Sequence, residues 1–213
     1  MNVQEATTRR LPDLKERHLP ENCRETINTI LKETYGYEQF RNLEIYDDLS
    51  KGKEKLCISQ GQLIENVILE AEKAWKGETQ VDNILLTAPT GSGKSLLFQL
   101  PAIYLGKEYN LLTIVVSPLK ALIVDQVESL QELGYARVAY ASSDLSPEQK
   151  MEVYRQVREG EIDLFYLSPE LLLSYDIKHF VGERRIGLVV VDEAHTVTTW
   201  GKEFRVDYWF LGR

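Results

Sequence analysis

Ala88-Pro89-Thr90-Gly91-Ser92-Gly93-Lys94-Ser95 is the stretch that decides the fold of this chain. Residues 83–87, just before it, form an apolar run of strand length, and residues 96–100, just after it, favour a helix. A glycine-rich loop between a strand and a helix N-terminus presents backbone N–H groups to phosphate oxygens. The stretch therefore predicts an α/β domain with a phosphate-binding loop.

The loop residues have distinct expected roles. Small glycines let the backbone close around the phosphates, Lys94 reaches the β and γ phosphates, and the Ser95 hydroxyl binds Mg²⁺. The expected nucleotide-binding residues of the loop are Thr90, Gly91, Ser92, Gly93, Lys94 and Ser95.

A second motif, Asp192-Glu193-Ala194-His195, follows the apolar run at residues 186–191. Parallel α/β sheets bind their ligands at the carboxyl ends of the strands, where this acidic pair is expected to lie. Asp192 is expected to hold Mg²⁺ and Glu193 to polarise the attacking water. The two motifs together predict an ATP site.

The rest of the chain divides into three predicted parts. Residues 1–20 are polar and predict a flexible arm, and residues 21–79 predict a helical lead-in with helices at 21–33 and 62–75. A charged stretch at 47–55 predicts an exposed loop. Strands and helices alternate from residue 80 onward, which predicts a mostly parallel sheet with helices on both faces.

The predicted elements of the α/β part follow from apolar runs and capping residues. Strands are expected at 83–87, 111–116, 137–140, 163–167 and 186–191, and a helix at 119–133. Ser146 and Gln149 fit a capping box around Pro147, which predicts the start of another helix there.

Composition limits the classes of function. The chain has 213 residues, which suits one α/β domain with an appendage or two small domains. No apolar run reaches membrane length, and the first residues lack the pattern of a secretory signal, so a cytoplasmic protein without membrane contact is expected. Cys23 and Cys57 are too few for a disulfide framework or a zinc site. The net charge of −8 counts against a nucleic-acid partner, which usually meets a basic face.

Two predicted strands end in a Ser-Pro pair. Ser117 and Lys120 follow one strand, and Ser168 follows another. Serine and proline are common helix-capping residues, which is the structural interpretation. Free N–H groups and a hydroxyl at a helix start also bind phosphate, so these residues are candidates for contact with a nucleic-acid backbone.

The order of these motifs resembles that of superfamily-two helicases, and in finer detail the RecQ family. The matching segments are the phosphate loop, residues 117–127, residues 166–172 and the Asp-Glu-Ala-His motif. Residues 31–41 resemble the family's lead-in, Gly61-Gln62 its glutamine signature, and residues 200–208 its aromatic-rich loop. The resemblance covers about residues 30 to 213.

The resemblance implies further site residues. Tyr37 and Arg41 would sandwich the adenine, and Gln62 would hydrogen-bond to its edge. His195 would sense the nucleotide state. The residues implied to contact single-stranded DNA through the aromatic loop are Trp200, Phe204 and Arg205.

Some features leave alternatives open. Residues 42–60 separate the lead-in from the glutamine, so either an insertion loops out or Arg41 is not the true partner. Tyr37 and Phe40 are also compatible with simple core packing. The aromatic loop is also compatible with packing against a neighbouring domain, and it carries Thr199 and Lys202 where the family usually has glutamine and histidine.

The resemblance implies the first RecA-like domain, residues 80–213, of an ATP-dependent helicase acting on single-stranded or partly duplex DNA. Its partner would be a second RecA-like domain of the same protein, which supplies arginine fingers; without them little ATP turnover is expected. One alternative is a superfamily-two translocase or RNA helicase motor that does not unwind DNA. Another is a small-molecule kinase, which would need an arginine-rich lid that the sequence does not show.

Overall fold

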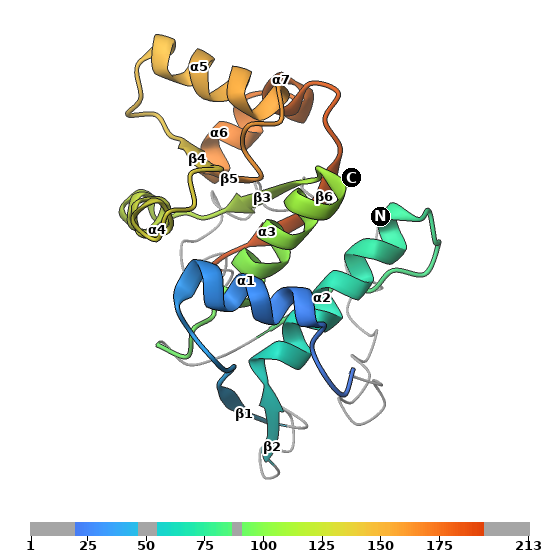
Figure 1. Cartoon of the computed structure of the whole chain (residues 1–213). Coiled ribbons are helices and arrows are strands. Elements are labelled where there is room, and N and C mark those ends of the chain that lie inside the picture. The colour runs from blue at the N-terminus through green and yellow to red at the C-terminus, as the bar shows by residue number, and fades with distance from the viewer. Residues whose placement is uncertain (1–19, 47–54, 87–90, 194–213) are drawn as a thin grey trace, which may run out of the picture.

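A four-stranded parallel sheet forms the centre of the protein (Figure 1). The computed structural model describes residues 20–46, 55–86 and 91–193. The strands are β3 (Leu112–Val116), β4 (Val138–Ala141), β5 (Leu164–Leu167) and β6 (Ile186–Val191), in the order β4-β5-β3-β6. The predicted α/β class and parallel sheet are confirmed, and the last four predicted strands agree with the structure to within a residue or two.

Helices cover both faces of this sheet, as Figure 1 shows. The first face packs against α1 (Glu25–Tyr35), α2 (Gln60–Trp75), α3 (Leu96–Tyr109) and α4 (Lys120–Glu132). The second face packs against α5 (Pro147–Arg158), α6 (Pro169–Ser174) and α7 (Ile177–Val181). Alternate strand residues serve the two cores: Val115 belongs to the first, whereas Ile114 and Val116 belong to the second.

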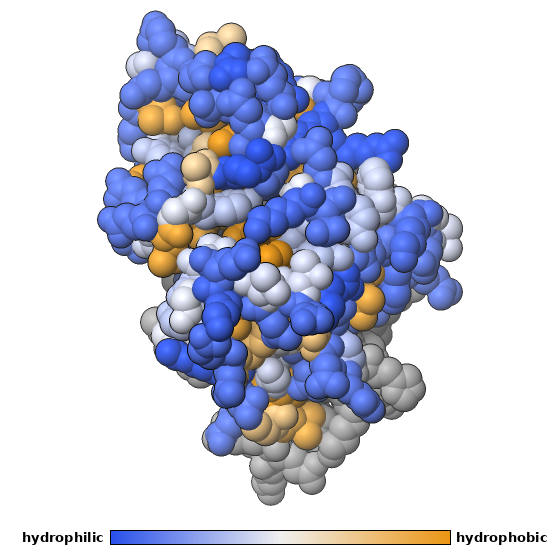
Figure 2. Space-filling view, in the orientation of Figure 1, coloured by the Kyte–Doolittle hydropathy of each residue, from blue (hydrophilic) through white to orange (hydrophobic). Residues whose placement is uncertain are grey.

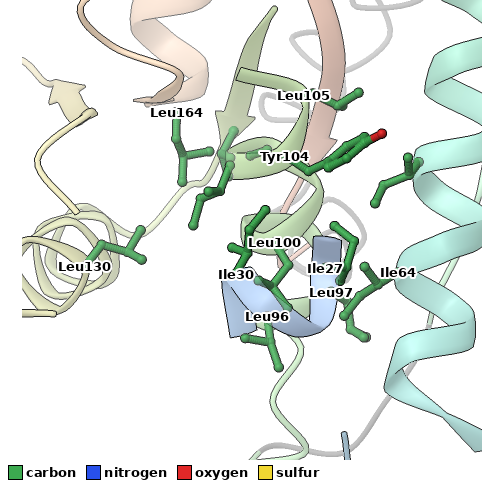
Figure 3. Close-up of a cluster of buried hydrophobic side chains, with 14 of the residues drawn as sticks. Ile27, Ile30, Ile64, Leu96, Leu97, Leu100, Tyr104, Leu105, Leu130 and Leu164 are labelled. Carbon is green, nitrogen blue, oxygen red and sulfur yellow. The ribbon is translucent and has the colours of Figure 1, made fainter. Parts of the chain in front are cut away.

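Helix α3 is the structural centre of the first core. Most of its residues are buried, since it lies between the sheet and helices α1 and α2. Figure 3 shows Leu97 and Leu100 of this helix close to Ile27 of α1 and Ile64 of α2. A helix that is apolar on all sides is held on all sides. The phosphate loop therefore leads into a helix whose position is fixed by packing.

The segment that interrupts the helical lead-in folds as a β-hairpin. Strands β1 (Asn42–Tyr46) and β2 (Lys55–Ser59) pair antiparallel, with Asn42 opposite Ser59. Of the charged loop expected at 47–55, residues 47–54 lie outside the described residues, and Lys55 begins β2. Because the hairpin closes on itself, the backbone N–H of Gln60 donates to the carbonyl oxygen of Arg41 at 2.9 Å. The insertion therefore loops out, and its two ends are neighbours.

The strand predicted at 83–87 is not present in the residues that the structure describes. Residues 81–86 have no regular secondary structure, and Leu85 is 65% exposed. The Asp82 N–H donates to the Glu70 carboxylate of α2 instead. An apolar run becomes a strand only where a neighbouring strand accepts its backbone hydrogen bonds. No described strand lies beside this segment, so residues 81–86 do not form the strand that their apolar pattern predicts.

Strand β6 is the edge of the described sheet. It pairs with β3 on one side, and Val189 on this strand is 54% exposed although the run is apolar throughout. The face of the molecule in Figure 2 is otherwise largely hydrophilic, with hydrophobic residues in small groups. No helix within the described ranges is long and apolar enough to span a membrane.

Candidate nucleotide site

The phosphate loop has the backbone conformation that its glycines predict. Gly91 and Gly93 have φ angles of 79° and 78°, a region that side-chain-bearing residues rarely adopt. Ser95 stands at the N-cap of α3 without a capping hydrogen bond from its side chain, so the helix does not use this hydroxyl. The buried Ser92 hydroxyl has no hydrogen-bond partner among the described residues. Thr90 lies outside those residues.

Gln60 connects the phosphate loop to the lead-in, a contact that sequence reasoning missed. Its side chain is 2% exposed; Nε2 donates to the Ser92 carbonyl at 3.0 Å and Oε1 accepts from the Arg41 N–H at 3.1 Å. A Cβ atom on Gly93 would lie 2.7 Å from this Nε2, so glycine is required for the approach. The sequence signal was a second glutamine two residues before Gln62.

Gln62 is engaged elsewhere. Its Oε1 accepts from the Ser59 N–H at 3.0 Å, which completes a capping box at the start of α2. Its Nε2 donates to the carbonyl oxygen of Pro20 at 3.2 Å. This placement does not support the prediction that Gln62 binds the adenine edge, because both ends of its amide stabilise the helix start.

The two lead-in aromatics have different environments. Tyr37 is 51% exposed and stacks on Tyr35, with ring centroids 6.3 Å apart and planes at 16°. It is therefore not a core residue. Phe40 packs against the first core and against Gly61, where a Cβ atom would lie 2.7 Å from its ring. Arg41 is exposed beside Gln60. An exposed ring and an exposed guanidinium are each able to stack on a flat aromatic ligand.

Asp192 lies at the carboxyl end of β6, as predicted. Its N–H donates to the Val116 carbonyl at 2.9 Å, which fixes it beside the end of β3. Its Oδ1 accepts from the Glu193 N–H at 2.9 Å, and its Oδ2 accepts from Gln126 Nε2 at 3.4 Å. Glu193 has a φ of 50°, a conformation that is uncommon outside glycine and that clusters at functional sites.

Burial raises the pKa of Asp192 above its ordinary value. The Glu193 N–H, the Gln126 amide and the positive charge of Lys94 oppose this rise without cancelling it. The Lys94 charge thus acts on the Asp192 carboxylate across residues that are far apart in the sequence. Helix α3, which begins directly after the phosphate loop, packs against β3 and β6, so the loop and Asp192 belong to elements that are in contact.

The two Ser-Pro serines differ in their hydrogen bonds. The Ser168 Oγ accepts from the Leu171 N–H at 3.4 Å and caps α6, as the structural interpretation predicted. The Ser117 hydroxyl is buried without a partner in the described part of the chain. Lys120 forms an ion pair with Asp144 at 2.9 Å and also contacts Ser143. The implied residues His195, Trp200, Phe204 and Arg205 lie outside the described residues.

The DEAD/DEAH box helicase model matches residues 62–210, which include both nucleotide motifs. The chain belongs to the DEAD/DEAH box helicase family. The match begins two residues after Gln60 and extends through the sheet to the end of the acidic motif and beyond.

Relatives of this helicase domain are RecQ helicases. The chain is 30% identical over 187 residues to the ATP-dependent DNA helicase RecQ of Haemophilus influenzae, covering 88% of this chain and 25% of the relative. It is 34% identical over 191 residues to the ATP-dependent DNA helicase RecQ of Synechocystis, covering 89% and 33%. The chain thus spans a quarter to a third of the length of these relatives.

A solved helicase structure has a similar fold. The DUF1998 helicase MrfA bound to DNA aligns with a TM-score of 0.50 at 22% identity, covering 84% of this chain and 21% of that one. The likeness supports the RecA-like helicase fold of this domain.

Proposed function

We propose that this chain is the ATP-binding motor domain of a RecQ-like DNA helicase, which couples ATP hydrolysis to movement on single-stranded DNA. The observation that carries the proposal is the pairing of a glycine-rich loop at the start of α3 with Asp192 at the carboxyl end of β6, in a sheet against which α3 packs. The RecQ relatives favour this function over a translocase or RNA helicase motor.

The residues present fit a magnesium–nucleotide ligand. Among the described residues there is no group of three or more His, Cys, Asp or Glu side chains that would cage a metal. Mg²⁺ in nucleotide sites is commonly held by one or two protein oxygens together with substrate phosphates and water. The Ser95 hydroxyl, unused by its helix, and the Asp192 carboxylate are those oxygens in our proposal. The cation would neutralise charge on the phosphates.

The protein residues would then act in fixed roles. The N–H groups of Gly91 to Ser95 and the Lys94 ammonium would orient the phosphates, because they lie at the N-terminus of α3. Glu193 would orient and polarise the attacking water, since it follows Asp192 directly. Arginine fingers from a second RecA-like domain would complete the site.

On the adenine side, we propose Tyr37 and Arg41 as stacking residues, with Gln60 in place of Gln62 as the glutamine of the site. Gln60 holds Arg41 and the phosphate loop together through one amide. Its loss would separate base binding from phosphate binding. Gln62 remains a helix-capping residue in this proposal.

For DNA, we propose the carboxyl edge of the sheet as the contact with the sugar-phosphate backbone. The Ser117 hydroxyl is buried and unpaired within the described residues, so it would break no hydrogen bond there on donating to a phosphate, once a shift of the covering atoms lets the phosphate reach it. Lys120 would exchange Asp144 for a phosphate. Trp200, Phe204 and Arg205 would stack on bases, with His195 linking them to the nucleotide.

The test is nucleotide binding and turnover by the chain and its Lys94→Ala and Glu193→Gln variants. We expect Mg²⁺-dependent binding of a fluorescent ATP analogue, lost in Lys94→Ala and kept in Glu193→Gln. Turnover by the whole protein that carries this domain should rise with single-stranded DNA and be abolished by Glu193→Gln. Equal binding by wild type and Lys94→Ala would contradict the nucleotide site. Stimulation by RNA or duplex DNA alone would favour the alternative motor.

A further inference from the structure

A line of polar side chains, buried in its middle, runs from half-buried Tyr35 on the adenine side of the proposed site to half-buried Asp192. The Tyr35 hydroxyl donates to Gln99 Oε1 at 2.9 Å, and Gln99 Nε2 donates to the Tyr166 oxygen at 3.1 Å. The Tyr166 hydroxyl donates to Gln126 Oε1 at 3.0 Å, and Gln126 Nε2 donates to Asp192 Oδ2 at 3.4 Å. We call these five residues the Tyr35–Asp192 network.

Every donor in the network faces the same way. Each hydroxyl and amide donates to the next residue in the direction of Asp192. The Asp192 carboxylate only accepts, so it selects the orientation of the Gln126 amide, and this orientation selects the others in turn. Hydrogen bonds aligned in one direction in a low-dielectric interior strengthen one another. The Tyr166 hydroxyl thus holds the Gln126 amide oxygen, and the amide nitrogen points toward Asp192.

Burial keeps water out of the network and keeps its donors protonated. Tyr166 is fully buried, and Gln99 and Gln126 are nearly so. Burial raises the pKa of both Tyr35 and Tyr166 well above the ordinary value for a phenol. The raised pKa of each hydroxyl favours its protonated, hydrogen-bond-donating form.

The network joins the parts of the proposed site through separate elements. Tyr35 ends α1 and stacks on the exposed ring of Tyr37. Gln99 lies one helical turn after Ser95 in α3, and its N–H donates to the Ser95 carbonyl at 2.9 Å. Gln126 belongs to α4, which follows the Ser117–Lys120 turn. The network thus links the proposed adenine-binding residues, the start of α3 after the phosphate loop, and the proposed metal ligand Asp192.

We propose that Gln126 is a positioning residue for the motor reaction: anchored by Tyr166, it orients the Asp192 carboxylate toward the place where a nucleotide-bound divalent cation would meet it. This inference rests on the nucleotide-binding function proposed above. Outer residues that orient a metal ligand typically affect metal affinity by about 10–100-fold. The 3.4 Å contact is long for a hydrogen bond, so it leaves the carboxylate able to turn toward a cation while limiting the turn.

The experiment measures how strongly Mg²⁺ tightens the binding of a fluorescent ATP analogue to this chain. Two variants interrupt the network: Gln126→Leu removes the donor to Asp192, and Tyr166→Phe removes the anchor of Gln126. We expect Gln126→Leu to lower the apparent Mg²⁺ affinity of the protein–nucleotide complex about tenfold, and Tyr166→Phe to lower it less. Binding of the analogue in the presence of a chelator should be unchanged in both.

Tyr135→Phe is the matched control. Tyr135 is also buried, and its hydroxyl donates to Asp163 at 3.1 Å at the opposite end of the sheet. Tyr166→Phe and Tyr135→Phe should lose similar unfolding free energy in urea, but only Tyr166→Phe should change the Mg²⁺ dependence. If Tyr166→Phe folds and keeps the wild-type Mg²⁺ dependence, the network only satisfies buried polar groups and the inference fails. If the wild-type chain itself shows no Mg²⁺-dependent binding, the proposed function fails, and the inference with it.

Discussion

Two carboxylates at opposite ends of the same sheet have contrasting surroundings. Asp163, at the amino end of β5, is fully buried and accepts hydrogen bonds from Tyr135, Arg137 and Arg184 at 2.6–3.1 Å. Asp192, at the carboxyl end of β6, is half-buried and accepts from one backbone N–H and one distant amide. One carboxylate is saturated with short, charged donors, and the other is not.

We take this difference to separate a structural carboxylate from the one that we propose to be functional. Two guanidinium groups and a hydroxyl compensate the buried charge of Asp163, so nothing remains for a ligand. Asp192 carries a desolvation cost that its described neighbours only partly offset, which its raised pKa reports. A buried carboxylate with few hydrogen-bond donors favours the binding of a positively charged ligand beside it.

Removal of the two carboxylates should lower stability by very different amounts. Asp163→Ala leaves Arg184 buried without its ion-pair partner, so we expect a loss of about 3–5 kcal/mol of unfolding free energy. Asp192→Ala removes a poorly compensated charge and should change the unfolding free energy by less than about 1 kcal/mol. Urea unfolding followed by circular dichroism measures both. Equal losses in the two variants would remove the distinction drawn between the carboxylates.

The packing around Asp163 can be tested from the neighbouring helix. A Cβ atom on Gly106 of α3 would lie 2.4 Å from Asp163 Cγ, so Gly106→Ala should displace the ion pair. We expect a loss of about 1–3 kcal/mol, although alanine is the better helix former. Lys107→Ala, one residue along the same helix and exposed, is the control and should be nearly neutral. A stabilised Gly106→Ala protein would show that the Asp163 site is loosely packed.

Ser168 and Ser117, at the carboxyl edge of the sheet, allow the same comparison between a paired and an unpaired polar group, with smaller expected effects. Ser168→Ala removes the cap of α6 and should cost about 1 kcal/mol of unfolding free energy. Ser117→Ala removes a buried hydroxyl that has no partner in the described residues, so its stability should stay the same or rise slightly. Thermal unfolding of the two variants gives the comparison. A larger loss for Ser117→Ala would mean that its hydroxyl is structural.

Glu72 offers a pH test of a second saturated carboxylate. Burial opposes its charge, but hydrogen bonds from Arg24, Tyr109 and Tyr104 outweigh burial and lower the pKa of Glu72. A carboxylate with a lowered folded-state pKa contributes stability above its unfolded value, about 4.5, and loses it as pH falls through the folded value. The unfolding free energy of wild type should therefore decrease more steeply with acid below about pH 4.5 than that of Glu72→Gln. Parallel pH profiles would contradict this.

Local patterns predicted most of the fold. Apolar runs gave β3 to β6 within a residue or two, and the Ser146 capping box at the start of α5 is confirmed. The run at 83–87 failed because a strand depends on its neighbours, which a local pattern does not contain. The hairpin β1–β2 was missed because charged residues at 47–55 dominated the interpretation of the segment.

The sequence by itself determined the family, the glycine conformations of the phosphate loop and the place of Asp192 at a strand end. These follow from spacing and from residues that few others can replace. Only the tertiary structure showed that Gln60 rather than Gln62 contacts the loop, and that Gln126 contacts Asp192. Amide side chains bond to whatever the fold brings within about 3 Å, and the sequence does not record which neighbour that is.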